Sequence, residues 1–210
     1  MMEIREHAIL FALTAKHCLD IAGHENGERL IRDITVLYGH KRGERMRRRA
    51  EADCETPDIA AYLVHGEWQG KPGENISTMS SESGRTVSRV TKCAWHDTWK
   101  ALGLQEYGRY YCRYIDQALC EGFHGTFSLE IPASMGSGDD HCVFVWSQAA
   151  DEKDVARRKE KLGGSGILPF DFHCQELYEC ASAVLIESGR KDILSGIRNE
   201  FKMLTGVSIG

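Results

Sequence analysis

The stretch from Cys93 to Cys142 concentrates side chains whose types are suited to chemistry. Cys93 lies three residues before His96, and Cys112 lies four residues before Asp116. Thiolates act as nucleophiles, carboxylates accept protons, and imidazoles both give and accept them. The stretch therefore predicts a site for nucleophilic or acid–base catalysis, provided that the elements carrying these residues converge.

Cys93 and His96 form a Cys-x-x-His pair at a predicted junction between a strand and a helix. Backbone amides at a helix N-terminus and a nearby imidazolium would lower the pKa of this thiol, which makes Cys93 the best nucleophile candidate. The same pair could instead bind zinc together with Cys112 and Cys142. Because no Cys-x-x-Cys or His-x-x-x-His spacing supports a metal site, we expect no cofactor, and zinc remains the alternative.

Cys112, Asp116 and Cys120 are spaced by four residues and would lie on one face of a helix. A carboxylate on a largely apolar helix is costly to bury unpaired, so Asp116 must reach solvent or have a partner. In a partly closed site Asp116 would serve as a general base. The alternative is a surface aspartate beside two packed cysteines.

The composition excludes two broad classes of function. A net charge of −5 and a pI near 6.0 argue against a general nucleic-acid binder. The one basic run, 41–49, includes Arg42 and contains Glu44, so we expect it to be a solvated helix face. No apolar stretch approaches a membrane span, and the acidic first residues do not resemble a secretion signal. We therefore expect a cytoplasmic protein whose eight cysteines are reduced, and any single cysteine is more often a core residue than a functional one.

The elements that must position these residues follow from hydrophobic periodicity. Helical spacing of apolar residues predicts helices over residues 4–21, 28–51, 58–65, 94–102, 105–121, 170–187 and 191–205. Strand character predicts two hairpins, 75–81 with 85–93 and 126–131 with 142–146, the second closed by a long turn over 132–140. This order predicts an α+β fold in which an antiparallel sheet of two hairpins packs with helices.

We expect residues 1–210 to form a single α+β domain in four parts. These are an N-terminal helical part over 1–70, a hairpin-helices-hairpin core over 75–147, a mobile excursion over 151–166 and C-terminal helices over 170–206. Gly39 and Gly43 lie four apart in a predicted helix, where each costs about 1 kcal/mol relative to Ala. They indicate a close helix contact, which we favour, or a ligand lying against the backbone. This face and the apolar faces of the terminal helices are compatible with a homodimer.

Several short motifs are shared with a known family. They are Tyr38-Gly39-His40-Lys41-Arg42-Gly43, Cys93-Ala94-Trp95, Tyr111-Cys112 with Asp116, Gly122-Phe123, and Gly138-Asp139 with Cys142-Val143-Phe144. Through these positions the chain resembles the L-2-amino-thiazoline-4-carboxylic acid hydrolase family from about residue 28 to 180. The segment from Glu130 to Phe144 is also similar to the end of 4-vinyl-reductase-type small-ligand domains. That wider group resembles haem nitric-oxide sensors and Golgi-transport subunits in fold.

The resemblance implies hydrolysis of a five-membered thiazoline ring to N-carbamoyl-L-cysteine. Such a reaction needs a base or nucleophile for C2, an acid for the leaving thiolate and a cation for the substrate carboxylate. We assign the first role to Cys93 or Asp116, the second to His96 and the third to Arg42. Cys112 and Cys142 complete the expected catalytic group, and the residues expected to bind substrate are Tyr38, Arg42, Tyr111, Glu130 and Asp139.

The competing class is a non-enzymatic protein of the same fold that binds a small ligand, since fold does not fix function. A thiol or metal sensor using Cys93, Cys112 and Cys142 is a third alternative. The partner expected in the first two cases is a small molecule, with no nucleic acid and no membrane.

Overall fold

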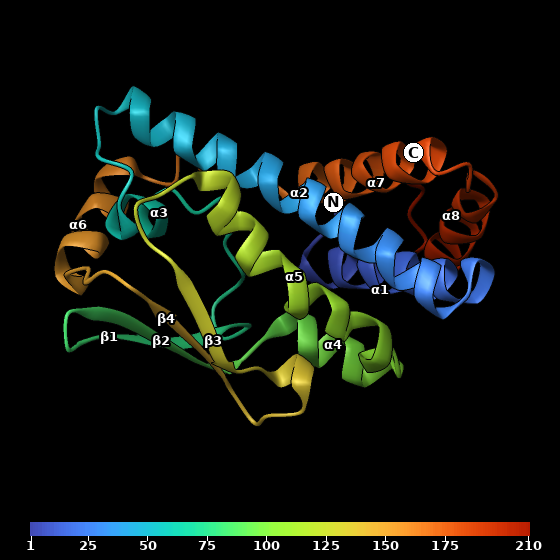
Figure 1. The fold of residues 1–210 in the computed structure, drawn as a ribbon, viewed down its shortest axis with the longest axis horizontal. Coiled ribbons are helices and arrows are strands. Elements are labelled where there is room, and N and C mark those ends of the chain that lie inside the picture. Colours follow the sequence, from blue (N-terminus) through green and yellow to red (C-terminus); the bar gives the residue numbers. More distant parts are fainter. The chain divides into compact units, whose positions relative to one another are not determined.

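The computed structural model describes residues 1–210 as eight α-helices and a four-stranded antiparallel sheet, an α+β fold as expected (Figure 1). The helices are α1 (Ile4–Ala22), α2 (His24–Ala52), α3 (Ile59–Val64), α4 (Ala94–Leu102), α5 (Gln105–Phe123), α6 (Glu152–Leu162), α7 (Phe170–Glu187) and α8 (Asp192–Thr205). The strands are β1 (Ile76–Glu82), β2 (Arg85–Lys92), β3 (Leu129–Ala133) and β4 (Cys142–Trp146). None of the helices combines the length and the apolar character that crossing a membrane requires.

The chain divides into two compact units, each built from separate stretches of sequence. The helical unit contains Met1–Tyr38, Ala94–Ile115 and Pro169–Gly210, and the sheet unit contains Gly39–Cys93 and Asp116–Leu168. Helices α2 and α5 each contribute their first part to the helical unit and their last part to the sheet unit. The single domain expected from the sequence stays a prediction.

In the sheet unit the strands are ordered β1-β2-β4-β3, and all neighbours are antiparallel. The β1–β2 hairpin turns at Ser83 and Gly84, both with positive φ, the geometry that closes a two-residue hairpin. The expected strand at 126–131 begins only at Leu129 and runs through Pro132. Its register with β4 shifts between Glu130 and Ala133, because Pro132 cannot donate to the ladder.

Two glycines bring α2 into close contact with α5 inside the sheet unit. A Cβ atom on Gly39 would lie 2.6 Å from Cβ of Ala118, and one on Gly43 would lie 2.3 Å from the carbonyl oxygen of Leu119. The expected close helix contact is therefore confirmed. Because α5 covers this glycine face, the same face cannot form a homodimer interface.

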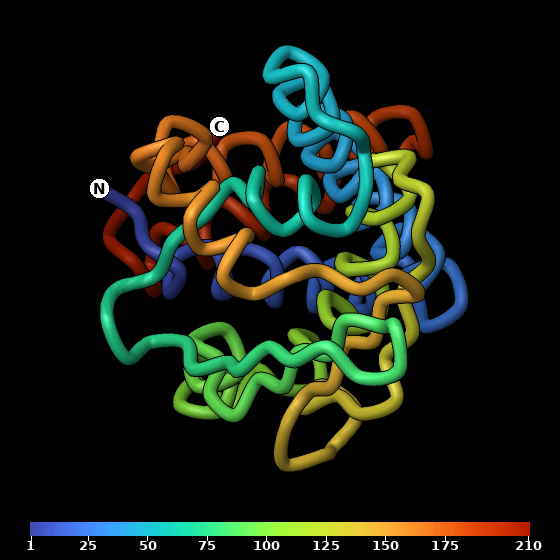
Figure 2. Tube along the Cα trace, turned by 90° about the vertical axis from the view of Figure 1, so that its left-hand side faces the viewer, coloured from blue at the N-terminus to red at the C-terminus, as the bar shows by residue number.

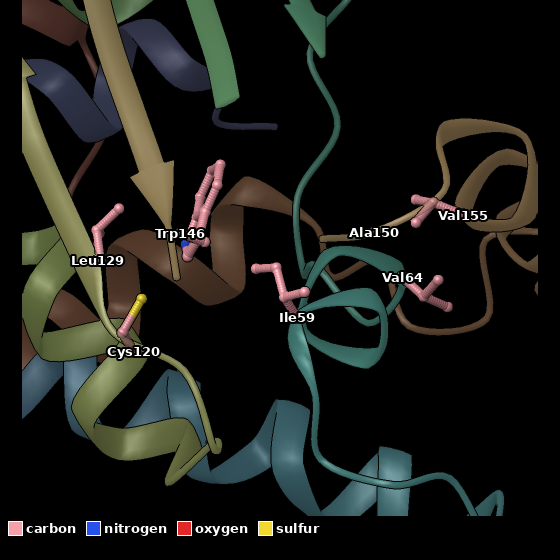
Figure 3. Close-up of a cluster of buried hydrophobic side chains, with 7 residues drawn as sticks. All are labelled: Ile59, Val64, Cys120, Leu129, Trp146, Ala150 and Val155. Carbon is pink, nitrogen blue, oxygen red and sulfur yellow. The ribbon is translucent and has the colours of Figure 1, made fainter. Parts of the chain in front are cut away.

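The hydrophobic core of the sheet unit lies where α3, α5 and α6 meet the strands. Figure 3 shows its buried side chains, which are Ile59, Val64, Cys120, Leu129, Trp146, Ala150 and Val155. Helices α3 and α6 lie side by side in this unit (Figure 1). Trp146 ends β4, pairs with Thr86 on one side and Leu129 on the other, and so stands in an interior strand.

A mobile excursion was expected over residues 151–166, and the structure has a helix, α6, over most of this segment. Asp151 caps α6 by accepting a hydrogen bond from the backbone N–H of Asp154 at 2.9 Å. Gly163 ends the helix in the left-handed conformation. Only Val155 of this helix is buried, so its stability rests on its caps and on charge pairs such as Asp154 with Arg157.

In the helical unit α1 is buried on most of its surface by α4, α7 and α8. Trp99 of α4 fixes one of these contacts by donating its indole N–H to the carbonyl of Ala8 at 2.8 Å. Figure 2 marks both chain ends, and both lie against α7. The backbone N–H of Met2 donates to Asp171 at 3.2 Å, and Gly210 lies against the ring of Tyr178.

Candidate functional site

A buried carboxylate and three arginines form an ion cluster in the sheet unit. Glu67, in the loop after α3, has a fully buried side chain. Arg45 donates to its two oxygens at 2.9 Å each, Arg49 donates at 3.0 Å, and Arg42 lies at 3.4 Å. The arginines are spaced by three and four residues, so one face of α2 presents them all. The expected solvated face is therefore wrong for Arg42, which is buried, and for its two partly buried neighbours.

The charges in this cluster do not cancel. Burial alone would raise the pKa of Glu67, but the hydrogen bond from Arg45 and the charges of Arg42, Arg45 and Arg49 outweigh it and lower that pKa. Glu67 is consequently ionised at neutral pH, and one carboxylate faces three guanidinium groups. The Nε atom of Arg49 is buried and has no hydrogen-bond partner. The cluster thus favours the approach of a further anion.

Asp116 is the carboxylate best suited to proton transfer in the sheet unit. It lies on α5, is partly exposed and makes no hydrogen bond through its side chain. Burial raises its pKa to about 6, and the charge of Arg42 opposes that rise. A base whose pKa lies just below neutrality is ionised at pH 7 and still binds a proton well, which is the compromise that general-base catalysis needs.

Tyr62 and Cys120 lie within the electrostatic influence of Asp116 in the same unit, and Trp146 lies beside both of them. The charge of Asp116 raises the pKa of both Tyr62 and Cys120, although burial is the larger cause for each. The pKa of Cys120 rises to about 12, so this residue stays a protonated thiol. Hydrogen bonds from both Tyr62 and Trp146 to this thiol oppose the rise, and the ring centroids of Tyr62 and Trp146 lie 6.4 Å apart.

Three of the predicted site residues, Glu130, Asp139 and Cys142, lie in β3, in β4 and in the turn between these strands, where they make structural contacts. The buried thiol of Cys142 accepts a hydrogen bond from the backbone N–H of Met135 at 3.3 Å, and burial raises its pKa. Asp139 accepts a hydrogen bond from the backbone N–H of Ser134 at 2.8 Å, which closes the turn. Glu130 is exposed and pairs with Arg85 at 2.8 Å. These contacts give each residue a structural role, and their functional roles stay predictions.

The helical unit brings together the predicted residues Tyr38 and Tyr111 around a buried histidine. His7 receives a hydrogen bond at Nδ1 from the indole N–H of Trp95 at 3.0 Å. Because an indole nitrogen only donates, Nδ1 carries no proton and Nε2–H of His7 donates to the hydroxyl of Tyr38 at 3.0 Å. The hydroxyl of Tyr38 also forms a hydrogen bond with Nδ1 of His173 at 3.4 Å. The ring of Tyr111 packs edge-on against His7, with centroids 5.6 Å apart.

The structure divides the remaining predicted residues between the units. Cys93, partly exposed, is the last residue of its stretch in the sheet unit and directly precedes α4. His96 and Cys112 are partly exposed and belong to the helical unit. Within residues 1–210 no group of three or more His, Cys, Asp or Glu side chains is arranged to hold a metal ion. The zinc alternative therefore gains no support from the side-chain geometry.

The sequence indicated Arg42 and Asp116 as candidate site residues, but it did not indicate most of the residues that contact them. Glu67 follows a short helix in a loop rich in glycine, where a charged residue is expected to face solvent. Tyr62 and Trp146 read as core residues, because aromatic side chains in short elements usually are. The signal that could have indicated the ion cluster is the spacing of Arg42, Arg45 and Arg49 along α2, because residues three and four apart lie on one helix face.

Together these features describe an α+β protein with an ion cluster and an acid–base carboxylate in its sheet unit. The chain belongs to the L-2-amino-thiazoline-4-carboxylic acid hydrolase family, whose sequence profile matches residues 2–146. This match begins earlier and ends earlier than the resemblance noted over residues 28 to 180. Comparisons with curated proteins and with solved structures gave no match.

Proposed function

We propose that this chain is a hydrolase that opens a small cyclic amidine, L-2-amino-thiazoline-4-carboxylate or a close relative, to N-carbamoyl-L-cysteine. Membership of the family supports the class of reaction. The observation that carries the mechanism is Asp116, a carboxylate whose pKa is raised to about 6 by burial, against the opposing charge of the buried Arg42.

Asp116 is the proposed general base. With the ring nitrogen of the substrate protonated, as is usual for an amidine, a water oxygen attacks C2 while Asp116 accepts one of its protons. The bond between C2 and sulfur then breaks, the second proton of the water passes to the sulfur, and the oxygen remains as the carbonyl of the urea group. The carboxyl of Asp116 afterwards releases its proton to solvent, which a pKa of about 6 permits at neutral pH.

The arginine cluster is the proposed counter-charge for the substrate carboxylate. Three guanidinium groups surround the carboxylate of Glu67, and the charge of Arg42 also acts on Asp116, so this face of α2 is predominantly cationic. A cationic face of this kind suits a substrate that carries a carboxylate. Arg42, Arg45 and Arg49 are held by the buried Glu67, which limits their movement and so favours a defined substrate position.

Cys93 remains the competing candidate for the attack on C2, with His96 as the proposed acid. A thiol directly before a helix is placed where backbone amides stabilise the thiolate. A Cys93→Ala variant separates this route from water attack, since loss of turnover in that variant alone would assign the first step to the thiol.

The test is turnover of L-2-amino-thiazoline-4-carboxylate by the reduced protein, with N-carbamoyl-L-cysteine measured by mass spectrometry. We expect Asp116→Asn to lower kcat/KM by about 100-fold or more, in the range typical of a lost general base. Glu121→Gln is the matched control, because Glu121 is an exposed carboxylate on the same helix. Equal turnover in both variants would refute the role of Asp116.

The runner-up is a non-enzymatic small-ligand-binding protein. The helices and antiparallel sheet are compatible with the proposed relation to the haem nitric-oxide sensor and Golgi-transport fold, whose members bind small ligands. Saturable binding of the thiazoline by the wild-type protein without product formation would select this alternative.

A further inference from the structure

The four-stranded sheet has one protected edge and one open edge. β3 forms the protected edge, because Pro132 and the shift in its register with β4 interrupt the pattern that a further strand would need. β1 forms the other edge, and its one irregularity lies at its start, between Ile76 and Ser77. It contains no proline and no lysine, and all its residues except the partly buried Met79 are exposed. β1 therefore lacks most of the features that keep an edge strand from pairing.

The hairpin fixes which backbone groups of β1 point away from the sheet. The two-residue turn at Ser83-Gly84 has positive φ at both positions, so the pair of residues that flanks it is hydrogen-bonded. Hydrogen-bonded and non-hydrogen-bonded pairs alternate along an antiparallel ladder, so the N–H and C=O groups of Ser77, Met79 and Ser81 point outward. None of these groups has a partner within the chain. The edge thus presents a row of alternating donors and acceptors.

We propose that the β1 edge pairs with the β1 edge of a second copy of this chain, in an antiparallel register centred on Met79. Met79 then lies opposite the partner's Met79, and Ser77 lies opposite the partner's Ser81 on either side of the two-fold axis. Every outward N–H and C=O group of the two strands forms a hydrogen bond in this register. The dimer has one sheet in the order β3-β4-β2-β1-β1-β2-β4-β3, whose outer edges are the protected β3 strands. The contact therefore closes on itself and does not propagate.

The charge of β1 favours this register over its neighbours. Glu82 is the only charged residue of the strand, and in this register it lies opposite the partner's Ile76, so the two Glu82 carboxylates are at opposite ends of the interface. A register centred on Ser81 would bring these carboxylates to neighbouring positions, where like charges repel. A register centred on Ser77 would leave the outward groups of Ser81 beyond the start of the partner strand.

The side chains along the edge also suit a strand of the same sequence. Met79 packs against the core of the sheet unit and remains partly exposed, and the partner's Met79 would cover it. On the other face Thr78 would lie opposite the partner's Ser80, and hydroxyl pairs of this kind are favourable across strands. A contact confined to one pair of strands buries less than the roughly 1,200–2,000 Å² of stable interfaces. We therefore expect a reversible dimer that dissociates on dilution, whether or not the proposed hydrolase activity holds.

The first test follows the mass of the protein by sedimentation velocity at concentrations from about 1 μM to 1 mM. The mass of the wild-type protein should rise from the 23.6 kDa of the monomer toward twice that value. Ser81→Pro should weaken association at least about tenfold, because it removes an outward N–H and sets the proline ring against the partner strand. Its Tm should fall little, since this N–H bonds to nothing within the chain.

Ser81→Ala is the matched control, because it changes the same side chain and keeps the backbone N–H. It should associate as the wild-type protein does. A wild-type protein that stays monomeric over the whole concentration range would overturn the proposal. A dimer that persists in Ser81→Pro would also overturn it and would assign association to another surface, such as the terminal helices.

The second test needs no variant. Amide hydrogen exchange, resolved by residue with NMR, should slow at the N–H groups of Ser77, Met79 and Ser81 as the concentration of wild-type protein rises. The amides of β3, at the other edge, should exchange at the same rate throughout. Exchange at the three β1 amides that does not depend on concentration would overturn the pairing of these edges.

Discussion

At the scale of single residues, the sheet unit is organised by charges that are only partly compensated. Glu67 is held by three arginines, whereas Asp116 has no hydrogen-bond partner and a raised pKa. The first arrangement stabilises the fold around a fixed anion. The second keeps a carboxylate available for proton transfer at a cost in stability.

The raised pKa of Asp116 predicts how its contribution to stability depends on pH. The folded-state pKa of Asp116, about 6, lies above the unfolded value near 3.9, so the unfolded chain releases its proton first as the pH rises. The contribution of Asp116 to stability should therefore decrease between about pH 4 and pH 6, so the difference in stability between Asp116→Asn and the wild-type protein should grow over this range. We expect the variant to be more stable at pH 7.5 by at most about 3 kcal/mol, and equally stable at pH 4. Urea unfolding at the two pH values measures this, and an equal difference at both would contradict it.

Glu67→Gln should be strongly destabilising. The substitution leaves three guanidinium groups facing one another around a buried neutral side chain, and breaking a buried charge pair in this way typically costs about 3–5 kcal/mol. Glu51→Gln is the control, because Glu51 is an exposed partner of Arg47 on the same helix and such pairs contribute little. Similar urea midpoints for the two variants would show that the cluster around Glu67 does not stabilise the fold.

At this scale the sequence indicated candidate residues but not their partners. The spacing of Cys112, Asp116 and Cys120 on one helix face and the glycine contact of α2 followed from periodicity alone. Glu67 could not be linked to Arg42 in the same way, because the two are joined by a loop whose path depends on tertiary packing. The tautomer of His7 likewise depends on Trp95, which is distant in sequence.

At the scale of elements, the close packing of α2 on α5 depends on glycine. Gly43→Ala would improve helix propensity by about 1 kcal/mol, but the added Cβ would meet backbone atoms of Leu119 and Phe123 at 2.3 and 2.5 Å. Backbone cannot yield as a flexible side chain does, so the variant should be destabilised by several kcal/mol. Lys41→Ala, at an exposed position of the same helix, is the control and should change stability little. A stabilised Gly43→Ala protein would contradict this contact.

Most of the elements could be predicted because their apolar residues follow helix or strand spacing. The hairpin at Ser83-Gly84 and the capped helix after Asp58 had clear local signals. Helix α6 had no such signal, since it buries a single apolar residue and is stabilised by caps and charge pairs.

Asp151→Ala should cost about 1 kcal/mol of stability because it removes the N-cap of α6, while Glu152→Ala should cost less. Equal losses in thermal unfolding of the two variants would argue against this cap.

At the scale of the whole molecule, the family match does not cover every segment that completes the helical unit. The match ends at Trp146, whereas α7 and α8 lie beyond it and bury α1. A fragment of residues 1–146 would expose the part of α1 that α7 and α8 cover. We expect this fragment to lose the fixed tertiary packing that near-ultraviolet circular dichroism detects, and a native-like spectrum would contradict this expectation.

Association into a homodimer through the faces expected from the sequence stays a proposal that now rests on the terminal helices alone. The glycine face of α2 is occupied by α5, while Ile186 of α7 and Met203 of α8 are exposed. The division into two units, each built from separate stretches of sequence, could not be predicted from the sequence. Helices α2 and α5 each belong to both units, and their hydrophobic periodicity is not interrupted at the boundary.

The most direct test of the central claim is the pH dependence of N-carbamoyl-L-cysteine formation by the wild-type protein. If Asp116 is the general base, kcat/KM for the thiazoline should be constant above about pH 6 and fall about tenfold for each pH unit below it. Asp116→Asn should lack this inflection and retain only residual turnover. Absence of product at every pH, or an identical profile in Asp116→Asn, would contradict the proposed role of this carboxylate.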